Sequence, residues 1–160
     1  MDVFVFGALC DEGREHETAW HLLSRAVEQV FGLTEVPEVA KGERGKPFFP
    51  ERPDIFFNLS HSRGAAVCAV HDKTIGVDVE KIRPAPKRLA NGLEDRAFFR
   101  LWTAKEATLK RDGGTLAALL REYEPDALCE THEEFLCGWI VTICPSESSE
   151  IHYQVVESIG

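Results

Sequence analysis

Residues 75–80, IGVDVE, constrain the fold of this 160-residue chain more than any other stretch. Alternate side chains of a β-strand point to opposite faces, so one face of this segment is apolar and carries Ile75, Val77 and Val79. The opposite face carries Asp78 and Glu80 with no basic residue between them. Neighbouring carboxylates repel unless positive charge lies between them, and a hard cation such as Mg²⁺ prefers oxygen ligands. The stretch predicts a strand with a metal site on one face; an exposed strand with two solvated acids is the alternative.

The rest of the chain predicts a mixture of strands and helices. Apolar and alternating runs indicate strands at residues 2–9, 55–60, 65–71, 74–81, 134–143 and 150–156. Helical periodicity indicates helices at 15–31 and 93–111 and a short one at 115–122, whereas the Gly- and Pro-rich residues 41–54 and 84–92 should be irregular. The order strand, helix, strand, strand occurs twice. It predicts an α+β fold with a single domain, residues 1–160, made of two similar β-α-β-β halves, residues 1–73 and 74–160.

Residues 102–110, WTAKEATLK, lie in the second long predicted helix. Residues four apart share one face of a helix, and the apolar stripe of this helix comprises Phe98, Leu101, Trp102 and Leu109. Lys105 and Glu106 stand where that stripe should continue, and Lys110 stands one turn after Glu106. A glutamate there can complete a metal site or take a proton, and a lysine can meet a phosphate. The alternative is an ordinary ion pair between Glu106 and Lys110, worth only about 0.3–0.5 kcal/mol.

Two further motifs precede the acidic strand. Residues 57–62, FNLSHS, end a predicted strand, where Ser60 offers a hydroxyl and His61 an imidazole that can be protonated against a phosphate. A Ser–His nucleophile pair is disfavoured because adjacent strand residues diverge and no G-x-S-x-G elbow is present; a structural histidine at a turn is the other alternative. The motif GKP, residues 45–47, places Lys46 in the preceding loop and is uninformative alone.

Charge is distributed unevenly along the chain. The net charge of −9 argues against nucleic-acid binding. Residues 81–111 nevertheless hold nine basic residues against three acidic ones, a net charge of +6. Such a basic strip can orient an acidic partner. The alternative is a solvent-exposed helix whose excess of basic residues is accidental.

The composition indicates a cytoplasmic protein. The five cysteines are odd in number and lack C-x-x-C spacing, so we expect reduced thiols packed as small apolar residues. No apolar run approaches the ~20 residues that a membrane helix needs. Residues 1–6 lack the basic lead of a signal peptide and are predicted to begin a strand.

Taken in order, GKP, FNLSHS, IGVDVE and WTAKEATLK resemble the four motifs of the phosphopantetheinyl transferases, most closely those of the surfactin-synthetase-activating type. Each motif is weak alone, but four in this order are specific, although the stretch that carries them, residues 45–116, is under half of the chain. The resemblance implies a fold of two α+β halves about a pseudo-twofold axis. It also implies transfer of 4′-phosphopantetheine from coenzyme A, the co-substrate, to a serine of an acyl or peptidyl carrier protein, with Mg²⁺ and with release of 3′,5′-ADP.

The resemblance further implies roles for single residues. Asp78, Glu80 and Glu106 would hold Mg²⁺ together with the pyrophosphate of coenzyme A. Glu106 would take the proton of the carrier serine, directly or through water, and Lys110 would neutralise charge on the pyrophosphate. The residues implied to bind coenzyme A are Lys46 and Pro47 at its adenosine end, Ser60 and His61 at its 3′-phosphate, and Lys105 and Lys110.

Two departures from the family pattern indicate a shortened member. The chain reaches GKP after only 44 residues, and the basic groups that bind the 3′-phosphate near the family's N-terminus have no clear equivalent except Arg14 or Arg25. The segment between Glu80 and Trp102 is also short, which bears on carrier docking more than on metal binding. We expect a monomer that binds an acidic carrier through residues 81–111. The alternatives are an inactive relative that binds coenzyme A or a carrier, and a metal-dependent phosphohydrolase of coenzyme A.

Overall fold

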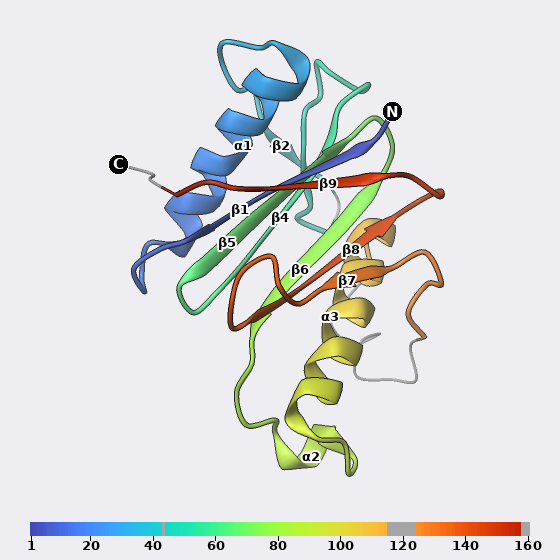
Figure 1. Cartoon of the computed structure of the whole chain (residues 1–160). Coiled ribbons are helices and arrows are strands. Elements are labelled where there is room, and N and C mark those ends of the chain that lie inside the picture. Colours follow the sequence, from blue (N-terminus) through green and yellow to red (C-terminus); the bar gives the residue numbers. More distant parts are fainter. Residues whose placement is uncertain (43, 115–123, 158–160) are drawn as a thin grey trace.

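Two β-sheets pack face to face at the centre of the computed structural model, and one long helix covers the outer face of each sheet (Figure 1). The structure describes residues 1–42, 44–114 and 124–157. The short helix expected at residues 115–122 lies outside these described residues. The layers follow the order α1, first sheet, second sheet, α3.

The first sheet has the strand order β4-β5-β1-β9. Its strands are β1 (Val3–Leu9), β4 (Phe56–Ser62), β5 (Ala65–His71) and β9 (Ile151–Val155). β5 pairs antiparallel with β4 and with β1, whereas β9 runs parallel to β1. The helix α1 (Glu15–Phe31) covers the outer face, where Leu22 and Leu23 are buried with Phe6. The helix ends at Gly32, which adopts a left-handed conformation with φ 69°.

The second sheet has the strand order β6-β8-β7 and is antiparallel throughout. Its strands are β6 (Ile75–Lys81), β7 (Glu130–His132) and β8 (Trp139–Pro145). The outer face is covered by α3 (Asp95–Asp112), which the four-residue helix α2 (Lys87–Ala90) precedes. A separate two-stranded ribbon joins β2 (Ala40–Lys41) to β3 (Pro47–Phe48).

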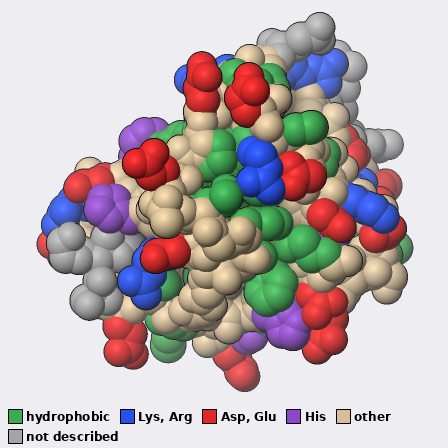
Figure 2. Space-filling view, turned by 90° about the horizontal axis from the view of Figure 1, so that it is seen from above, with side chains coloured by type: hydrophobic (Ala, Val, Ile, Leu, Met, Phe, Trp, Pro, Cys, Tyr) green, Lys and Arg blue, Asp and Glu red, His purple; other side chains and the backbone are tan. Residues whose placement is uncertain are grey.

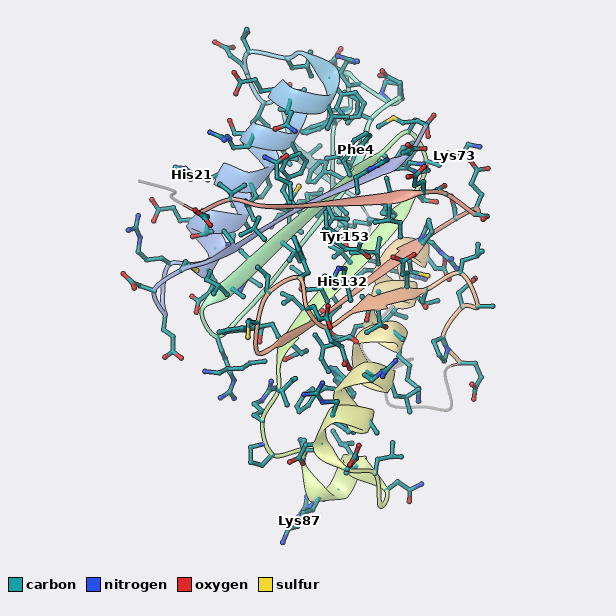
Figure 3. The ribbon with its side chains drawn as sticks, viewed as in Figure 1. Phe4, His21, Lys73, Lys87, His132 and Tyr153 are labelled. Carbon is teal, nitrogen blue, oxygen red and sulfur yellow. The ribbon has the colours of Figure 1, made fainter. Side chains whose placement is uncertain are left out.

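The two sheets bury a common apolar layer between them. Every residue of β5 is buried, because α1 covers one of its faces and the second sheet covers the other. The layer between the sheets includes Val3, Val5, Val67, Ile75, Val77, Val79, Val141 and Ile143. On the side of β9, the rings of His132 and Tyr153 point toward one another with centroids 4.5 Å apart (Figure 3).

Most of the predicted elements are confirmed within one or two residues at their ends, and the mixed α and β content agrees with an α+β fold. The apolar face predicted for α1 is buried or partly buried. Leu101, which was expected in the apolar stripe of α3, is 38% exposed, so that expectation is wrong. The buried face of α3 turns instead through Phe98, Phe99, Thr103 and Ala107. Three short strands, β2, β3 and β7, and the helix α2 were not predicted.

One strand joins a different sheet from the one expected. We expected residues 150–156 to complete the second half beside residues 134–143, but β9 pairs with β1 in the first sheet. The partner of β8 is instead β7, in the register Glu130 to Ile143. Alternation of side chains indicates that a segment is a strand but does not indicate its partner, and this is the cause of the error.

The surface reflects the negative net charge. Figure 2 looks onto the end of the molecule opposite α2, where acidic side chains are scattered among apolar and basic ones. Among the described helices, none has the length and apolar character needed to cross a membrane.

The outer face of β6 and the helix α3 make an unusually close contact at Gly76. A Cβ atom at this position would lie 1.9 Å from the carbonyl oxygen of Ala107 and 2.7 Å from the amide nitrogen of Arg111. These are backbone atoms, so they can move away only if the whole helix shifts. The glycine of the motif IGVDVE therefore determines how near α3 lies to the acidic strand.

Replacing Gly76 with alanine should lower the free energy of unfolding by about 3 kcal/mol, because α3 must be displaced. Urea denaturation measures this value. Gly42→Ala is the matched control, since its Cβ would meet only the carbonyl oxygen of Lys46, at 3.6 Å, and it should change the value by less than about 0.5 kcal/mol. A G76A protein with the unfolding midpoint of the wild type would contradict the packing described here.

Candidate functional site

Three carboxylates from two elements meet at the contact between β6 and α3. Asp78 and Glu80 lie on the outer face of β6, and Glu106 projects from α3. One carboxylate oxygen from each lies within 4.8 Å of the others. The spacing of two residues on the strand and the close approach of the helix bring these acids together, although Glu106 is far from the other two in the sequence.

Asp78 lies at the centre of this group and is only 2% exposed. Its Oδ1 accepts hydrogen bonds from the Ser60 hydroxyl at 3.1 Å and from the Lys110 ammonium at 3.0 Å. Its Oδ2 is buried and, apart from the hydrogen bond that a protonated Glu106 donates to Asp78, has no hydrogen-bond partner among the described residues. A buried carboxylate oxygen without a partner is costly, so this atom marks a place for a positively charged ligand.

Lys110 supplies positive charge beside the acids. Its Nζ donates to three oxygens: Asp78 Oδ1, the Ser60 hydroxyl at 3.2 Å and the carbonyl of Val77 at 3.3 Å. Lys110 follows Glu106 by one helical turn, and the two side chains therefore share one face of α3. About a third of the Lys110 side chain is exposed, so it can also meet a ligand.

The environment of Glu106 disfavours its charge. Burial raises the pKa of Glu106 from its ordinary value of 4.5 to about 9, and the neighbouring Asp78 carboxylate adds to this rise while Lys110 opposes it. Glu106 is therefore protonated at neutral pH unless additional positive charge is present. A cation among the three acids would lower this pKa and release the proton.

Glu80 is held at the rim of the group. Its Oε2 accepts hydrogen bonds from the Ser62 hydroxyl at 3.2 Å and from the Arg83 guanidinium at 2.8 Å. Arg83 in turn lies over the ring of Phe99, 4.5 Å from its centroid. These contacts fix the carboxylate in place beside Asp78.

Side chains of β4 attach the first sheet to this site. Asn58 accepts a hydrogen bond from the amide of Val77 at 2.8 Å, and Ser60 accepts one from the amide of Val79 at 3.2 Å. Ser62 continues the series with its bond to Glu80. The sequence reasoning missed Asn58 and Ser62, although the alternation within FNLSHS places both on the same face as Ser60.

His61 is directed away from the acids. It lies on the opposite face of β4 from Ser60, and its ring is 5.9 Å from that of His16 on α1. Burial lowers the pKa of His61, and His16 contributes to the same shift. The structure therefore brings Ser60, but not His61, to the carboxylates.

Lys46 and Pro47 lie on the other side of Lys110. Together with Arg44, Asn58 and Lys110 they line a cavity of about 230 Å³. The Lys46 Nζ donates to the carbonyls of Ile75 at 3.2 Å and Arg111 at 3.4 Å, so it also ties the loop to the end of α3. Burial lowers the pKa of Lys46 to about 8.

The remaining basic residues named from the sequence lie outside this cluster. Lys105 is half-buried on α3, one residue before Glu106. Arg14 lies next to the first turn of α1 and pairs with Glu17 at 3.3 Å, and Arg25 is exposed on the same helix. Their contacts with a phosphate stay predictions.

This set of donors fits a hard divalent cation. Mg²⁺ is bound in proteins by carboxylates that leave other positions open for water or phosphate oxygens. Three clustered carboxylates, a buried oxygen without a partner and a single adjacent lysine match that requirement. The residues that could hold the metal are Asp78, Glu80 and Glu106.

Comparison with known proteins identifies relatives of one kind. No family model matches the chain. A 4′-phosphopantetheinyl transferase of Bacillus subtilis is 34% identical over 51% of this chain and 43% of the relative. The 4′-phosphopantetheinyl transferase AcpT of Salmonella typhi is 36% identical over 59% and 56%, and HetI of Nostoc sp. is 36% identical over 48% and 41%. The chain spans about half the length of the curated relatives it matches.

The stability of the metal-free protein should depend on pH, because the charged form of Glu106 is unfavourable in the folded state. Between pH 4.5 and about pH 9 the folded protein holds a proton that the unfolded chain has released, so the free energy of unfolding decreases as pH rises through this window. Glu106→Gln removes the titrating group and should raise the free energy of unfolding at pH 8 by roughly 1–3 kcal/mol relative to the wild type. The difference should shrink towards pH 5.

Urea denaturation in chelator at several pH values measures this difference. Glu28→Gln is the matched control, because Glu28 is an exposed glutamate of α1, and it should leave the pH profile unchanged. An E106Q protein that is less stable than the wild type at pH 8 would contradict the predicted cost.

Proposed function

We propose that this chain, which belongs to the 4′-phosphopantetheinyl transferase superfamily, transfers 4′-phosphopantetheine from coenzyme A to a serine of an acyl or peptidyl carrier protein. The reaction depends on Mg²⁺ and releases 3′,5′-ADP. Among the transferases of this superfamily, the four ordered motifs favour the surfactin-synthetase-activating type. The observation that carries the proposal is the meeting of Asp78, Glu80 and Glu106 beside Lys110.

The residues of the site have distinct tasks in this reaction. The carrier serine attacks a phosphorus of the pyrophosphate, and its hydroxyl proton goes to Glu106. Lys110 neutralises the charge that builds up on the phosphate oxygens. Bound Mg²⁺ would supply further positive charge to the same oxygens. Asp78 and Glu80 would hold the cation together with Glu106, and its charge would act with Lys110 to keep Glu106 ionised and able to act as the base.

Coenzyme A lies along the cavity beside Lys110. Lys46 and Pro47 contact its adenosine end, which is supported by the fact that they line the same cavity as Lys110. Lys105 and Lys110 face the phosphates. Ser60 and His61 were expected together at the 3′-phosphate, but their side chains diverge, and Ser60 is already bonded to Asp78. We therefore retain His61 for the phosphate and assign Ser60 to the support of Asp78.

The two halves of the fold are related by a pseudo-twofold axis in this proposal. The strands β1, β5 and β4 pair antiparallel in this order in the first sheet, and β6, β8 and β7 pair antiparallel in the corresponding order in the second. This correspondence supports a pseudo-twofold axis. Each half then has a β-α-β-β core, β1-α1-β4-β5 and β6-α3-β7-β8, to which the ribbon of β2 and β3, the helix α2 and the strand β9 are additions. The chain acts as a monomer in this arrangement.

The carrier docks on α2 and α3, which lie almost entirely within residues 81–111, the stretch with a net charge of +6. Arg96 and Arg100 are more than half exposed there and both pair with Glu133, at 3.0 and 3.6 Å. Leu93 and Leu101 are exposed beside them. An acidic surface with a few apolar side chains complements this combination.

A transfer assay tests the proposed activity. Purified protein incubated with apo-carrier, coenzyme A and Mg²⁺ should add the phosphopantetheine mass to the carrier, and mass spectrometry detects the addition. Glu106→Gln should reduce the rate at least about 100-fold through loss of the base, whereas the control Glu28→Gln should retain the rate of the wild type.

The same assay separates the alternatives. Release of 3′,5′-ADP without any carrier would indicate a phosphohydrolase of coenzyme A. Binding of coenzyme A without any transfer, tested across several acyl and peptidyl carriers, would indicate an inactive relative.

A second assay tests the docking surface. Arg96→Glu with Arg100→Glu should raise KM for the carrier roughly tenfold by charge repulsion and leave KM for coenzyme A nearly unchanged. The matched control is Arg52→Glu with Lys73→Glu, because these residues are also basic and paired with acids. Lys73 lies toward the end of the molecule away from Lys87 on α2 (Figure 3). Equal increases in KM for both substrates would refute the placement.

A further inference from the structure

Two cysteines lie close together at one end of the second sheet, one just before β7 and one in β8. Glu130, the first residue of β7, lies opposite Ile143 of β8. Cys129 directly precedes Glu130 and Cys144 directly follows Ile143, so the two cysteines lie near each other where this strand pair ends. Directly opposed residues of antiparallel strands have Cβ atoms about 4.5–5.5 Å apart. A disulfide requires Cα atoms about 4.4–6.8 Å apart, which is the range that opposed strand residues occupy.

The two sulfur atoms also share one hydrogen-bond partner. The Thr108 hydroxyl lies 3.1 Å from the Cys129 sulfur and 3.6 Å from the Cys144 sulfur. Both side chains therefore point to the same face of the sheet, beneath α3. Cys144 is buried, whereas Cys129 is partly exposed, so a reagent in solution reaches Cys129 first.

The contacts of the pair favour the thiolate of Cys129 and the protonated thiol of Cys144, whose pKa is raised by its hydrogen bond to Cys129 and by burial. The Arg111 guanidinium lies 3.3 Å from the Cys144 sulfur. The hydrogen bond from the Cys144 thiol lowers the pKa of Cys129 to about 7; burial opposes this shift, and Thr108 and Arg111 add to it. Thiolates are the nucleophiles in disulfide exchange, so Cys129 is suited to attack at neutral pH.

The other cysteines lack this combination. Cys68 is fully buried in β5, where burial raises its pKa. Burial also raises the pKa of the Cys10 thiol. Cys137 is exposed on the turn before β8 and is therefore a reference for simple accessibility.

We propose that Cys129 and Cys144 are a redox modification site that closes to an intramolecular disulfide by exchange with a small-molecule disulfide such as oxidised glutathione. The Cys129 thiolate attacks one glutathione sulfur, which forms a mixed disulfide and releases one glutathione thiolate. Cys144 then loses its proton and attacks the Cys129 sulfur, which expels the second glutathione thiolate. The two released thiolates take up the two protons of the cysteines. The protein dithiol is oxidised by two electrons, and glutathione disulfide is reduced to two glutathione molecules.

This site uses no member of the acidic cluster. Its test therefore stands whether or not the chain transfers phosphopantetheine. The bond would connect the segment before β7 to β8 directly under Thr108, in the helix that carries Glu106 and Lys110.

Peptide mapping of the full chain tests the proposal. The reduced protein is incubated with oxidised glutathione, remaining thiols are blocked with N-ethylmaleimide under denaturing conditions, and the digest is analysed by mass spectrometry. We expect the peptides of Cys129 and Cys144 to be linked, with loss of two hydrogen atoms, and Cys137 to carry glutathione or maleimide. Maleimide on both Cys129 and Cys144, or glutathione retained on Cys129, would overturn the proposal.

Two single variants test the order of the steps. In Cys144→Ser, Cys129 should accumulate as the mixed disulfide with glutathione, because no second thiol resolves it. In Cys129→Ser, the buried Cys144 should be recovered with maleimide alone. Cys137→Ser is the matched control and should form the same internal disulfide as the wild type. Absence of glutathione on Cys129 in the first variant would overturn the assignment of Cys129 as the attacking thiol.

Discussion

Hydrogen bonds from backbone amides of β6 to side chains of β4 hold the two sheets in the arrangement that the site requires. Both strands lie at the edge of their sheets, so the amides of Val77 and Val79 have no strand partner on this side. Asn58 and Ser60 accept hydrogen bonds from these amides, which satisfies donors that would otherwise be costly to bury. The same contact covers two sheet edges that could pair with other chains. It also aligns Asp78 with Ser60 and, through α3, with Lys110.

The acidic cluster lowers the stability of the folded protein but provides the carboxylates that the proposed reaction needs. Asp78 is buried with one oxygen satisfied and one without a partner among the described residues. Glu106 packs against it in surroundings that favour its neutral form. A core built only for stability would not place three carboxylates beside one lysine, because burying unpaired charge is expensive. The cation that the donors fit, and the phosphates that accompany it, would supply what the protein alone leaves uncompensated.

The sequence predicts the parts of this site that depend on local periodicity. The alternation in IGVDVE correctly places Ile75, Val77 and Val79 on the face toward the other sheet and Asp78 on the face toward α3. The helical spacing correctly places Lys110 one turn after Glu106. The error at Leu101 arose because α3 turns its buried face through Phe99 and Thr103 instead. The partner of β9 and the contacts of Asn58 depend on tertiary pairing, which one sequence does not encode in any local pattern. The charge environment of Glu106 likewise depends on how near α3 lies to β6.

The position of β9 has a consequence for the order of assembly. β1 and β9 lie nearly at opposite ends of the described chain, yet they pair directly. Contacts so distant in sequence carry a high loop-closure entropy and slow the folding of a domain. During synthesis on the ribosome, β1 and β5 emerge long before β9, so the free side of β1 stays unpaired until the second sheet has been translated. Throughout that interval β1 has an unpaired edge, and such edges make a nascent chain prone to aggregation and a target for chaperones.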